Sequence, residues 1–172
     1  PGDEVLMHRW SHPFNYEAAG AAMVAGVQIS PLDGERGMVN PATVVAAIRP
    51  VDDHCPPATL LTVEDTTNRG GGAVHALEHL DALAQAAHAH GLSAHMDGAR
   101  AWNAVVASGT SLARRARSFD SVSLCFSKGL GAPAGSVLCA DRARITVARR
   151  RRKMLGGGMR QSGVLAAAAL HA

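Results

Sequence analysis

The stretch ATLLTVEDTTNRGGGAVHALEHLDALAQAAHAHGLSAHMD, residues 58–97, decides the fold of this protein. It contains an apolar strand candidate at 58–64, a helix-like segment at 75–90 and a second strand candidate at 92–97. Gly91 is suited to end the helix, because glycine readily adopts the left-handed conformation found after many helices. A strand, a helix and a strand in this order predict two parallel strands joined by a crossover helix.

The same alternation continues on both sides of this stretch. Further strand candidates lie at 4–8, 27–32, 121–126 and 135–140. Helices are predicted between them at 15–25, 41–49, 99–107 with an extension to 117, 141–154 and 159–170. The sequence therefore predicts an α/β domain with a mainly parallel sheet flanked by helices, whose last two strands are close enough in sequence to form an antiparallel pair.

The composition fits one soluble globular domain. Of the 172 residues, 47% are hydrophobic and only 3% are aromatic, so the core is expected to consist of Ala, Val and Leu. No apolar run reaches membrane-spanning length, and the first residues resemble neither a signal nor a transit peptide. The widely spaced Cys55, Cys125 and Cys139 indicate reduced thiols. These features predict a cytoplasmic protein with no membrane partner.

The positive charge is carried almost entirely by arginine. The net charge is +3, and Lys128 and Lys153 are the only lysines. Arginines cluster at 114–117 and 142–153, which is compatible with nucleic-acid binding. However, the second cluster is interleaved with apolar residues and has no aromatic side chains for stacking on bases. A solvated helix face or a subunit contact explains it better, so no nucleic-acid partner is predicted.

Two strand ends carry reactive side chains, and ligands of parallel α/β sheets bind at the carboxyl ends of the strands. Asp97 ends the strand at 92–97, where a carboxylate suits a cation or a protonated ring nitrogen; the alternative is an N-cap for the following helix. Lys128 follows the strand at 121–126. Burial at that position would favour a neutral, nucleophilic amine that attacks a carbonyl group, whereas the alternative is a surface lysine.

Two glycine-rich loops provide further candidates. GGGM, residues 156–159, leaves backbone N–H groups free beside Arg160, which suits an anion such as phosphate or, alternatively, a hinge. VEDTTNRGGG, residues 63–72, places acidic, hydroxyl and amide side chains at a strand end, where they line a polar pocket or form a turn.

The segment HALEH, residues 75–79, matches a zinc-binding pattern of two histidines and a glutamate. The leucines around it, Leu77, Leu80 and Leu83, form an ordinary core stripe, and no further ligand is marked downstream. No metal is therefore predicted.

Five segments in the same order resemble the low-specificity L-threonine aldolases, which are fold type I enzymes dependent on pyridoxal phosphate. They are RWSHPFNYEAAGAA (9–22), LLTVEDTTNRGGG (60–72), HMDGARAWNA (95–104), LCFSKGLGAPAGSVL (124–138) and RRKMLGGGMRQSGVLAAAAL (151–170). The resemblance covers essentially the whole chain. It implies a three-layer sandwich, the large domain of the pyridoxal-phosphate-dependent transferase fold.

The resemblance also implies roles for individual residues. Lys128 would bind pyridoxal phosphate covalently, and Asp97 would pair with the pyridinium nitrogen. His12 matches the histidine that stacks on the cofactor ring and is a candidate base. Ser127, next to the lysine, would also contact the cofactor.

Three further residues take roles from the resemblance. Arg100 would lie near the phenolic oxygen of the cofactor or the carboxylate of the substrate, and Arg160 near the phosphate or a subunit contact. Thr67 would contact the substrate, although the family usually has histidine there, and threonine cannot act as a base near neutral pH.

The activity that the resemblance implies is cleavage of L-threonine or L-allo-threonine to glycine and an aldehyde, by a homotetramer. Residues 1–172 would be the central part of the large domain; the family's N-terminal phosphate-binding segment and C-terminal small domain lie outside the sequence. Two alternatives remain open: another fold type I lyase that catalyses β-elimination, and a catalytically incomplete fragment that serves as an oligomerisation or binding module.

Overall fold

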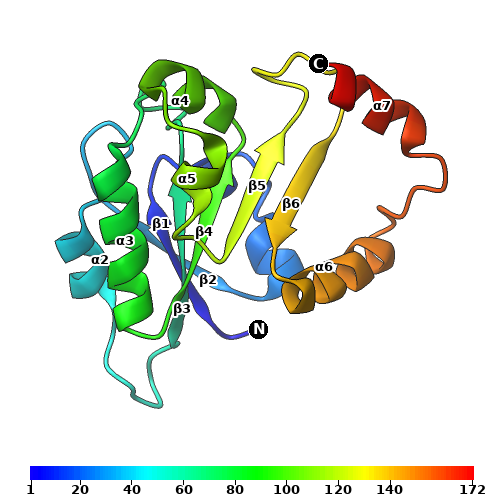
Figure 1. Ribbon diagram of the computed structural model, residues 1–172. Coiled ribbons are helices and arrows are strands. Elements are labelled where there is room, and N and C mark those ends of the chain that lie inside the picture. The colour runs from blue at the N-terminus through cyan, green and yellow to red at the C-terminus, as the bar shows by residue number, and fades with distance from the viewer.

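The computed structural model describes residues 1–172, which form one curved sheet with helices packed against it (Figure 1). The strands are β1 (Glu4–His8), β2 (Gln28–Leu32), β3 (Ala58–Glu64), β4 (Ser93–Gly98), β5 (Ser121–Cys125) and β6 (Ser136–Ala140). The helices are α1 (His12–Asn15), the π-helix η1 (Ala21–Ala25), α2 (Pro41–Ala47), α3 (Leu77–Ala89), α4 (Ala101–Ser108), α5 (Leu112–Ala116), α6 (Arg142–Met154) and α7 (Gly163–His171). None of these helices has both the length and the apolar character that a membrane crossing requires.

The strand order is β2-β1-β3-β4-β5-β6, and every adjacent pair is parallel except β5 with β6. The predicted α/β fold with a mainly parallel sheet is confirmed, and so is the antiparallel last pair. The chain passes from β1 outward to β2 and then returns to the other side of β1 to form β3. This reversal creates a topological switch point between β1 and β3, the place where open α/β sheets bind their ligands.

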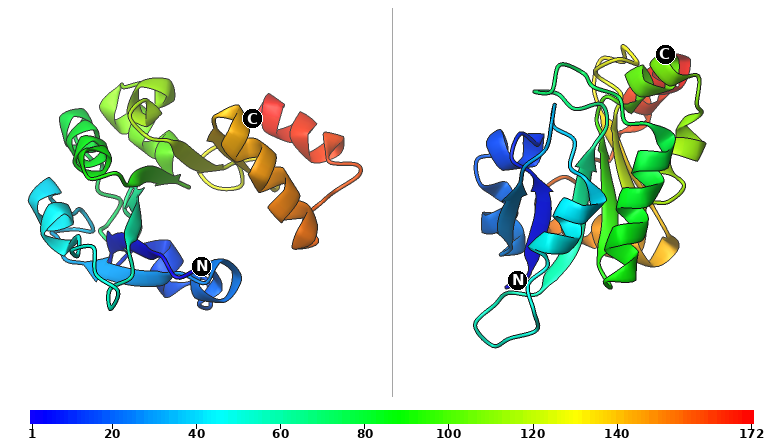
Figure 2. Two further views of the ribbon diagram at one scale, coloured as in Figure 1. Left: turned by 90° about the horizontal axis from the view of Figure 1, so that it is seen from below. Right: turned by 90° about the vertical axis from the view of Figure 1, so that its left-hand side faces the viewer.

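The outer side of the curved sheet carries the hydrophobic core. Figure 2 shows α2, α3, α4 and α5 along this side. Leu80 and Leu83 of α3 are fully buried in one cluster with Leu61 of β3 and Met96 of β4. Because side chains alternate along a strand, His95, the neighbour of Met96, belongs to the inner side. The outer side of the sheet is thus apolar, whereas the inner side carries polar side chains such as His95.

Helices approach the inner side of the sheet near its two edges, where η1 contacts β2 and α6 contacts β6 (Figure 2). Between these edges, the ring of His95 is hydrogen-bonded to two serines, with Nδ1 2.8 Å from Oγ of Ser121 and Nε2 3.4 Å from Oγ of Ser123. Helix α7 has no buried residue and lies outside the sheet (Figure 1). The middle of the inner side is therefore polar and largely satisfied by its own hydrogen bonds.

Two of the predicted helices are interrupted in the structure. Of the helix predicted at 15–25, only Asn15, the last residue of α1, and the π-helix η1 lie in helical elements, because Ala18 and Ala19 between them adopt left-handed φ values of 47° and 59°. The extension of the 99–107 helix is interrupted by Gly109, whose φ of 67° ends α4 before α5 begins. A right-handed helix does not continue through left-handed residues.

A fully buried ion pair connects α5 with the end of β3. Arg115 is 1% exposed and donates from Nε and Nη2 to Oδ2 of Asp65 at 2.9 and 2.6 Å. Its Nη2 also donates to the backbone carbonyl of His75 at 2.9 Å, and its Nη1 donates to Oγ of Ser108 at 3.2 Å. These contacts compensate both charges for the hydration that burial removes.

Replacement of Arg115 by methionine should strongly destabilise the fold. The substitution leaves Asp65 buried without its counter-charge, a change that typically costs about 3–5 kcal/mol. Urea unfolding followed by circular dichroism measures the loss. The exposed Arg117 provides the control, since Arg117→Met should change the free energy of unfolding by less than about 0.5 kcal/mol. Equal effects of the two substitutions would contradict a structural role for the pair.

Candidate active site at the carboxyl end of the sheet

The carboxyl ends of β3 and β4 bring two acidic side chains together. Glu64 is paired in register with Asp97, so both side chains lie on the inner side of the sheet. Asp97 is 9% exposed, and its Oδ1 accepts a hydrogen bond from the backbone N–H of Ala99 at 3.1 Å. This contact orients the carboxylate but does not cap a helix, because α4 begins only at Ala101.

Glu64 belongs to the polar segment that the sequence predicted at the end of β3, although no individual role was predicted for it. It is buried, and Oε1 has no hydrogen-bond partner. Burial, and then the charge of Asp97, raise the pKa of Glu64 to about 7, although the positive charges of Arg100 and Lys128 oppose this rise. The available signal was that the strand candidates 58–64 and 92–97 both end in an acid.

Arg100 lies beside these acids, as the resemblance implied for a residue of the site. Its Nη1 is 3.8 Å from Oε1 of Glu64, which permits ionic attraction but not a normal hydrogen bond. The same Nη1 atom is buried and has no hydrogen-bond partner. Arg100 therefore has capacity for a further negatively charged ligand.

Lys128 is placed in the loop after β5, at the same end of the sheet. The strand ends at Cys125, so both Ser127 and Lys128 are exposed rather than buried at the strand end. The expected desolvation of the lysine is therefore wrong for this chain. Its charge is nevertheless close enough to Glu64 to influence that acid. The amine is accessible to a ligand bound over the strand ends.

His12 approaches the site from the neighbouring β1. It is the first residue of α1, and its ring packs against Tyr16 with a centroid distance of 5.1 Å. Its Nε2 lies 2.9 Å from Oε1 of Glu17, whereas Nδ1 is buried without a hydrogen-bond partner. His12 thus has one nitrogen held by the protein and one that is free to act on a ligand.

Thr67 is buried in a contact between two loops. Its Oγ1 donates to the backbone carbonyl of Arg36 at 2.9 Å, and its N–H donates to the carbonyl of Ala73 at 3.0 Å. At Gly70, an added Cβ would lie 1.9 Å from the oxygen of Arg36 and 2.3 Å from Oγ1 of Thr67, so glycine is required there. The hydroxyl is therefore committed to the loop contact, and a contact with substrate stays a prediction.

Arg160 is not brought to the strand ends of this chain. It is exposed in the connection between α6 and α7, which projects to the far right in Figure 1. Within a single chain, the structure therefore does not assemble Arg160 with Asp97 and Lys128. Its predicted contact with a phosphate or a subunit remains a prediction.

The zinc-like segment 75–79 has a structural explanation. His75 precedes α3 and is 2% exposed, and its ring lies 5.3 Å from that of His79 in an edge-to-face arrangement. Nε2 of His79 contacts the carbonyl of Val39 at 2.7 Å, as a ring N–H donor would. No group of three or more potential metal-ligating side chains is found in the structure.

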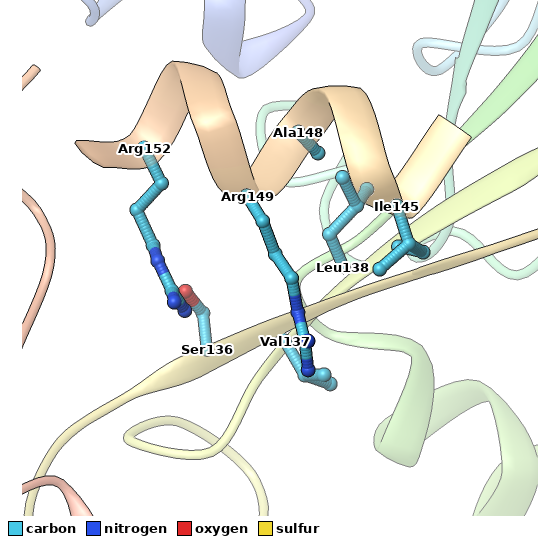
Figure 3. A pocket seen from close by; sticks show the side chains of 7 residues that line it. All are labelled: Ser136, Val137, Leu138, Ile145, Ala148, Arg149 and Arg152. Carbon is cyan, nitrogen blue, oxygen red and sulfur yellow. The ribbon is translucent and has the colours of Figure 1, made fainter. Parts of the chain in front are cut away.

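The cavity shown in Figure 3 lies away from these residues, between β6 and α6. It is lined by Ser136, Val137, Leu138, Ile145, Ala148, Arg149 and Arg152. Arg149 and Arg152 extend from the helix towards the strand, and both are exposed. No reactive side chain faces this groove, so the strand ends are the better candidate for chemistry.

A family model and individual relatives with similar sequences point to the same protein family. The family model described as "Beta-eliminating lyase" matches residues 1–172. The low specificity L-threonine aldolase of Escherichia coli (strain K12) is 42% identical over 172 residues, which cover 99% of this chain and 51% of that protein. The low-specificity L-threonine aldolase 1 of Arabidopsis thaliana is 40% identical over 98% of this chain and 48% of its own length. The chain therefore spans about half the length of these relatives.

Solved structures support the fold. The threonine aldolase of Leishmania major superposes with a TM-score of 0.85 at 22% sequence identity, and the match covers 98% of this chain and 49% of that one. At this identity the similarity establishes the fold alone.

Burial of His75 predicts a loss of stability in acid. Desolvation lowers the pKa of His75 from 6.5 to about 4, so between these values the unfolded chain binds a proton that the folded chain does not. This difference should remove roughly 2–3 kcal/mol as the pH falls through that range. His75→Leu should reduce the loss, whereas His171→Gln, at an exposed histidine, should retain it. The measurement is the unfolding midpoint as a function of pH. Identical pH dependence of wild type and His75→Leu would contradict the role assigned to His75.

The loop contact of Thr67 predicts a structural effect of Thr67→Val. Valine keeps the shape but removes the hydrogen bond to the carbonyl of Arg36, at a cost of about 1 kcal/mol. Thermal unfolding measures this cost, and the exposed Thr59→Val is the control. An unchanged unfolding midpoint combined with weaker binding of L-threonine would instead assign Thr67 to the substrate.

Proposed function

This chain belongs to the beta-eliminating lyase family, and from that premise we propose that the protein cleaves L-threonine or L-allo-threonine to glycine and an aldehyde. The family is dependent on pyridoxal phosphate. The observation that carries the proposal is that Asp97 and Arg100 at the end of β4, Lys128 after β5 and His12 after β1 all belong to the carboxyl end of one parallel sheet.

The residues present fit pyridoxal phosphate. Asp97 offers an oriented, nearly buried carboxylate for a protonated ring nitrogen. Lys128 offers an accessible amine for an aldehyde carbon. The buried Nη1 of Arg100 and Nδ1 of His12 lack partners within the protein, which is expected where a bound ligand completes the hydrogen bonds.

Each residue has a specific task in the proposed reaction. Asp97 holds the proton on the ring nitrogen, and Arg100 binds and orients the carboxylate of the amino acid. When bound, the cofactor supplies an electron-withdrawing ring that accepts the electron pair of the breaking carbon–carbon bond. Lys128 would be the residue that holds the cofactor covalently, through its amine.

A base must also remove the proton of the substrate's β-hydroxyl group. Thr67 is unsuited to this task, because its hydroxyl donates to the carbonyl of Arg36. His12 is the better candidate, since Nδ1 is free while Nε2 is held by Glu17. A water molecule activated by His12 would serve equally well.

The proposal includes an assembly larger than the 172 residues. The chain would supply the central part of the large domain, and other parts of the protein would supply the phosphate-binding loop and the small domain. A homotetramer would bring exposed arginines such as Arg160 to a neighbouring subunit. The half-length match to the relatives supports this division.

A second candidate is a fold type I lyase that catalyses β-elimination. Thr67, in place of the histidine usual in threonine aldolases, favours this alternative because it removes one basic group from the site. In this alternative, Lys128 and Asp97 keep the same tasks. The reaction products distinguish β-elimination from aldol cleavage.

Cofactor binding is tested by replacement of Lys128. The full-length protein with pyridoxal phosphate should show an absorption band of the lysine-bound cofactor that borohydride abolishes. Lys128→Ala should remove the band, and Lys128→Arg should also remove it, because arginine keeps the charge but has no nucleophilic amine. Glu78→Gln, at an exposed site on α3, should keep it. A band that persists in Lys128→Ala would rule out the assigned lysine.

Product analysis then separates the two candidate reactions. Incubation with L-threonine, L-allo-threonine and phenylserine should release glycine and the corresponding aldehyde. Release of ammonia and a keto acid without glycine would favour β-elimination instead.

A further inference from the structure

Glu64 is a buried acid to which the proposed function gives no role. Only 6% of the residue is exposed, and Oε1 has no hydrogen-bond partner. The guanidinium of Arg100 is adjacent, but its Nη1 stays 3.8 Å away and is also without a partner. Buried carboxylates and guanidinium groups normally satisfy each other directly. The hydrogen bonding of this pair is therefore incomplete, and Nη1 of Arg100 still has a donor that a negatively charged group could accept.

The charged groups around Glu64 come from three elements. Asp97 at the end of β4 repels a negative charge on Glu64, while Arg100, which follows β4, and Lys128, in the loop after β5, attract one. Burial outweighs each of these charges, and the pKa of Glu64 is raised to about 7. The balance between its charged and neutral forms is therefore sensitive to any change in the neighbouring charges.

The histidines at and after the end of β1 each have one ring nitrogen in contact with a group other than Glu64. Nε2 of His8 contacts the carbonyl of Gly34 at 3.0 Å, and Nε2 of His12 contacts Glu17 at 2.9 Å. Neither contact involves Glu64. A new charge at Arg100 is therefore a change that Glu64 should sense directly.

We propose that Glu64 takes up a proton when the carboxylate of an amino acid binds to Arg100; this inference rests on the proposed function. The incoming carboxylate competes with Glu64 for the guanidinium and adds negative charge beside Asp97. Both effects favour the neutral form of Glu64. The proton comes from solvent, forms one O–H bond on the carboxyl group of Glu64 and returns to solvent when the anion leaves. Glu64 acts through Arg100 and is a positioning residue.

This coupling gives the site a defined pH dependence. Because binding includes proton uptake, affinity for the carboxylate should fall as the pH rises above about 7, where free Glu64 is mainly ionised. Glutamine at position 64 is permanently neutral and leaves Arg100 available. Glu64→Gln should therefore bind the anion with little of this pH dependence and more tightly than wild type at high pH.

Isothermal titration calorimetry measures the coupled proton directly. The full-length protein loaded with pyridoxal phosphate is titrated with glycine at about pH 8, in two buffers with different heats of ionisation. Wild type should take up as much as one proton per site more than Glu64→Gln. Proton changes on glycine itself cancel in this difference. Glu78→Gln removes an exposed carboxylate of the same type and should behave as wild type.

The outcomes separate this inference from the proposed function. Equal proton uptake by wild type and Glu64→Gln, with the cofactor bound in both, would overturn the role of Glu64 and leave the proposed function intact. If no cofactor binds, the proposed function fails, and acetate serves as the probe with the cofactor-free protein. NMR of wild type containing isotope-labelled glutamate then measures the pKa of the Glu64 carboxyl group. The same measurement replaces the calorimetric comparison if Glu64→Gln does not fold. An upward shift of the pKa of Glu64 with acetate supports the inference, and no shift overturns it.

Discussion

The buried pair of Arg115 and Asp65 is the constraint on which the candidate site depends. Asp65 directly follows Glu64, and its backbone N–H donates to the carbonyl of Asp97 at 3.0 Å. Arg115 anchors Asp65 from α5 and also holds the carbonyl of His75. One guanidinium therefore ties together the ends of β3 and β4 and the approach to α3. Because both charges have left water, the arrangement is tolerated only in this geometry, which fixes where Glu64 and Asp97 point.

Local sequence signals were sufficient for the strands but not for every helix. Strand candidates 4–8 and 58–64 coincide with β1 and β3, because their apolar character and flanking turns are encoded within a few residues. The alanine-rich segment 15–25 has high helix propensity, yet Ala18 and Ala19 are left-handed. Propensity is worth only a fraction of a kcal/mol per residue, so the path imposed by tertiary structure overrides it.

The sequence predicted which residues lie at the strand ends, but it did not predict which side chains they contact there, because those contacts depend on how the strands pair. Asp97 follows from its strand end, but its partnership with Glu64 depends on the register of β3 and β4, which no local pattern encodes. Burial of Lys128 was wrong because β5 ends at Cys125, three residues earlier. The commitment of Thr67 to Arg36 links positions 31 residues apart in the chain. Each of these depends on long-range geometry.

Polar atoms without hydrogen-bond partners, rather than the groove between β6 and α6, distinguish the candidate functional end of this sheet. Elsewhere on the inner side, both ring nitrogens of His95 already have hydrogen-bond partners, in Ser121 and Ser123. Glu64 and Arg100 retain unpartnered atoms. His75 also has two unpartnered ring nitrogens, but it is almost completely enclosed, and its lowered pKa keeps the ring neutral. His75 is thus enclosed away from any ligand, whereas the incomplete ion pair of Glu64 and Arg100 lies at a strand end, where a ligand of suitable charge can complete it.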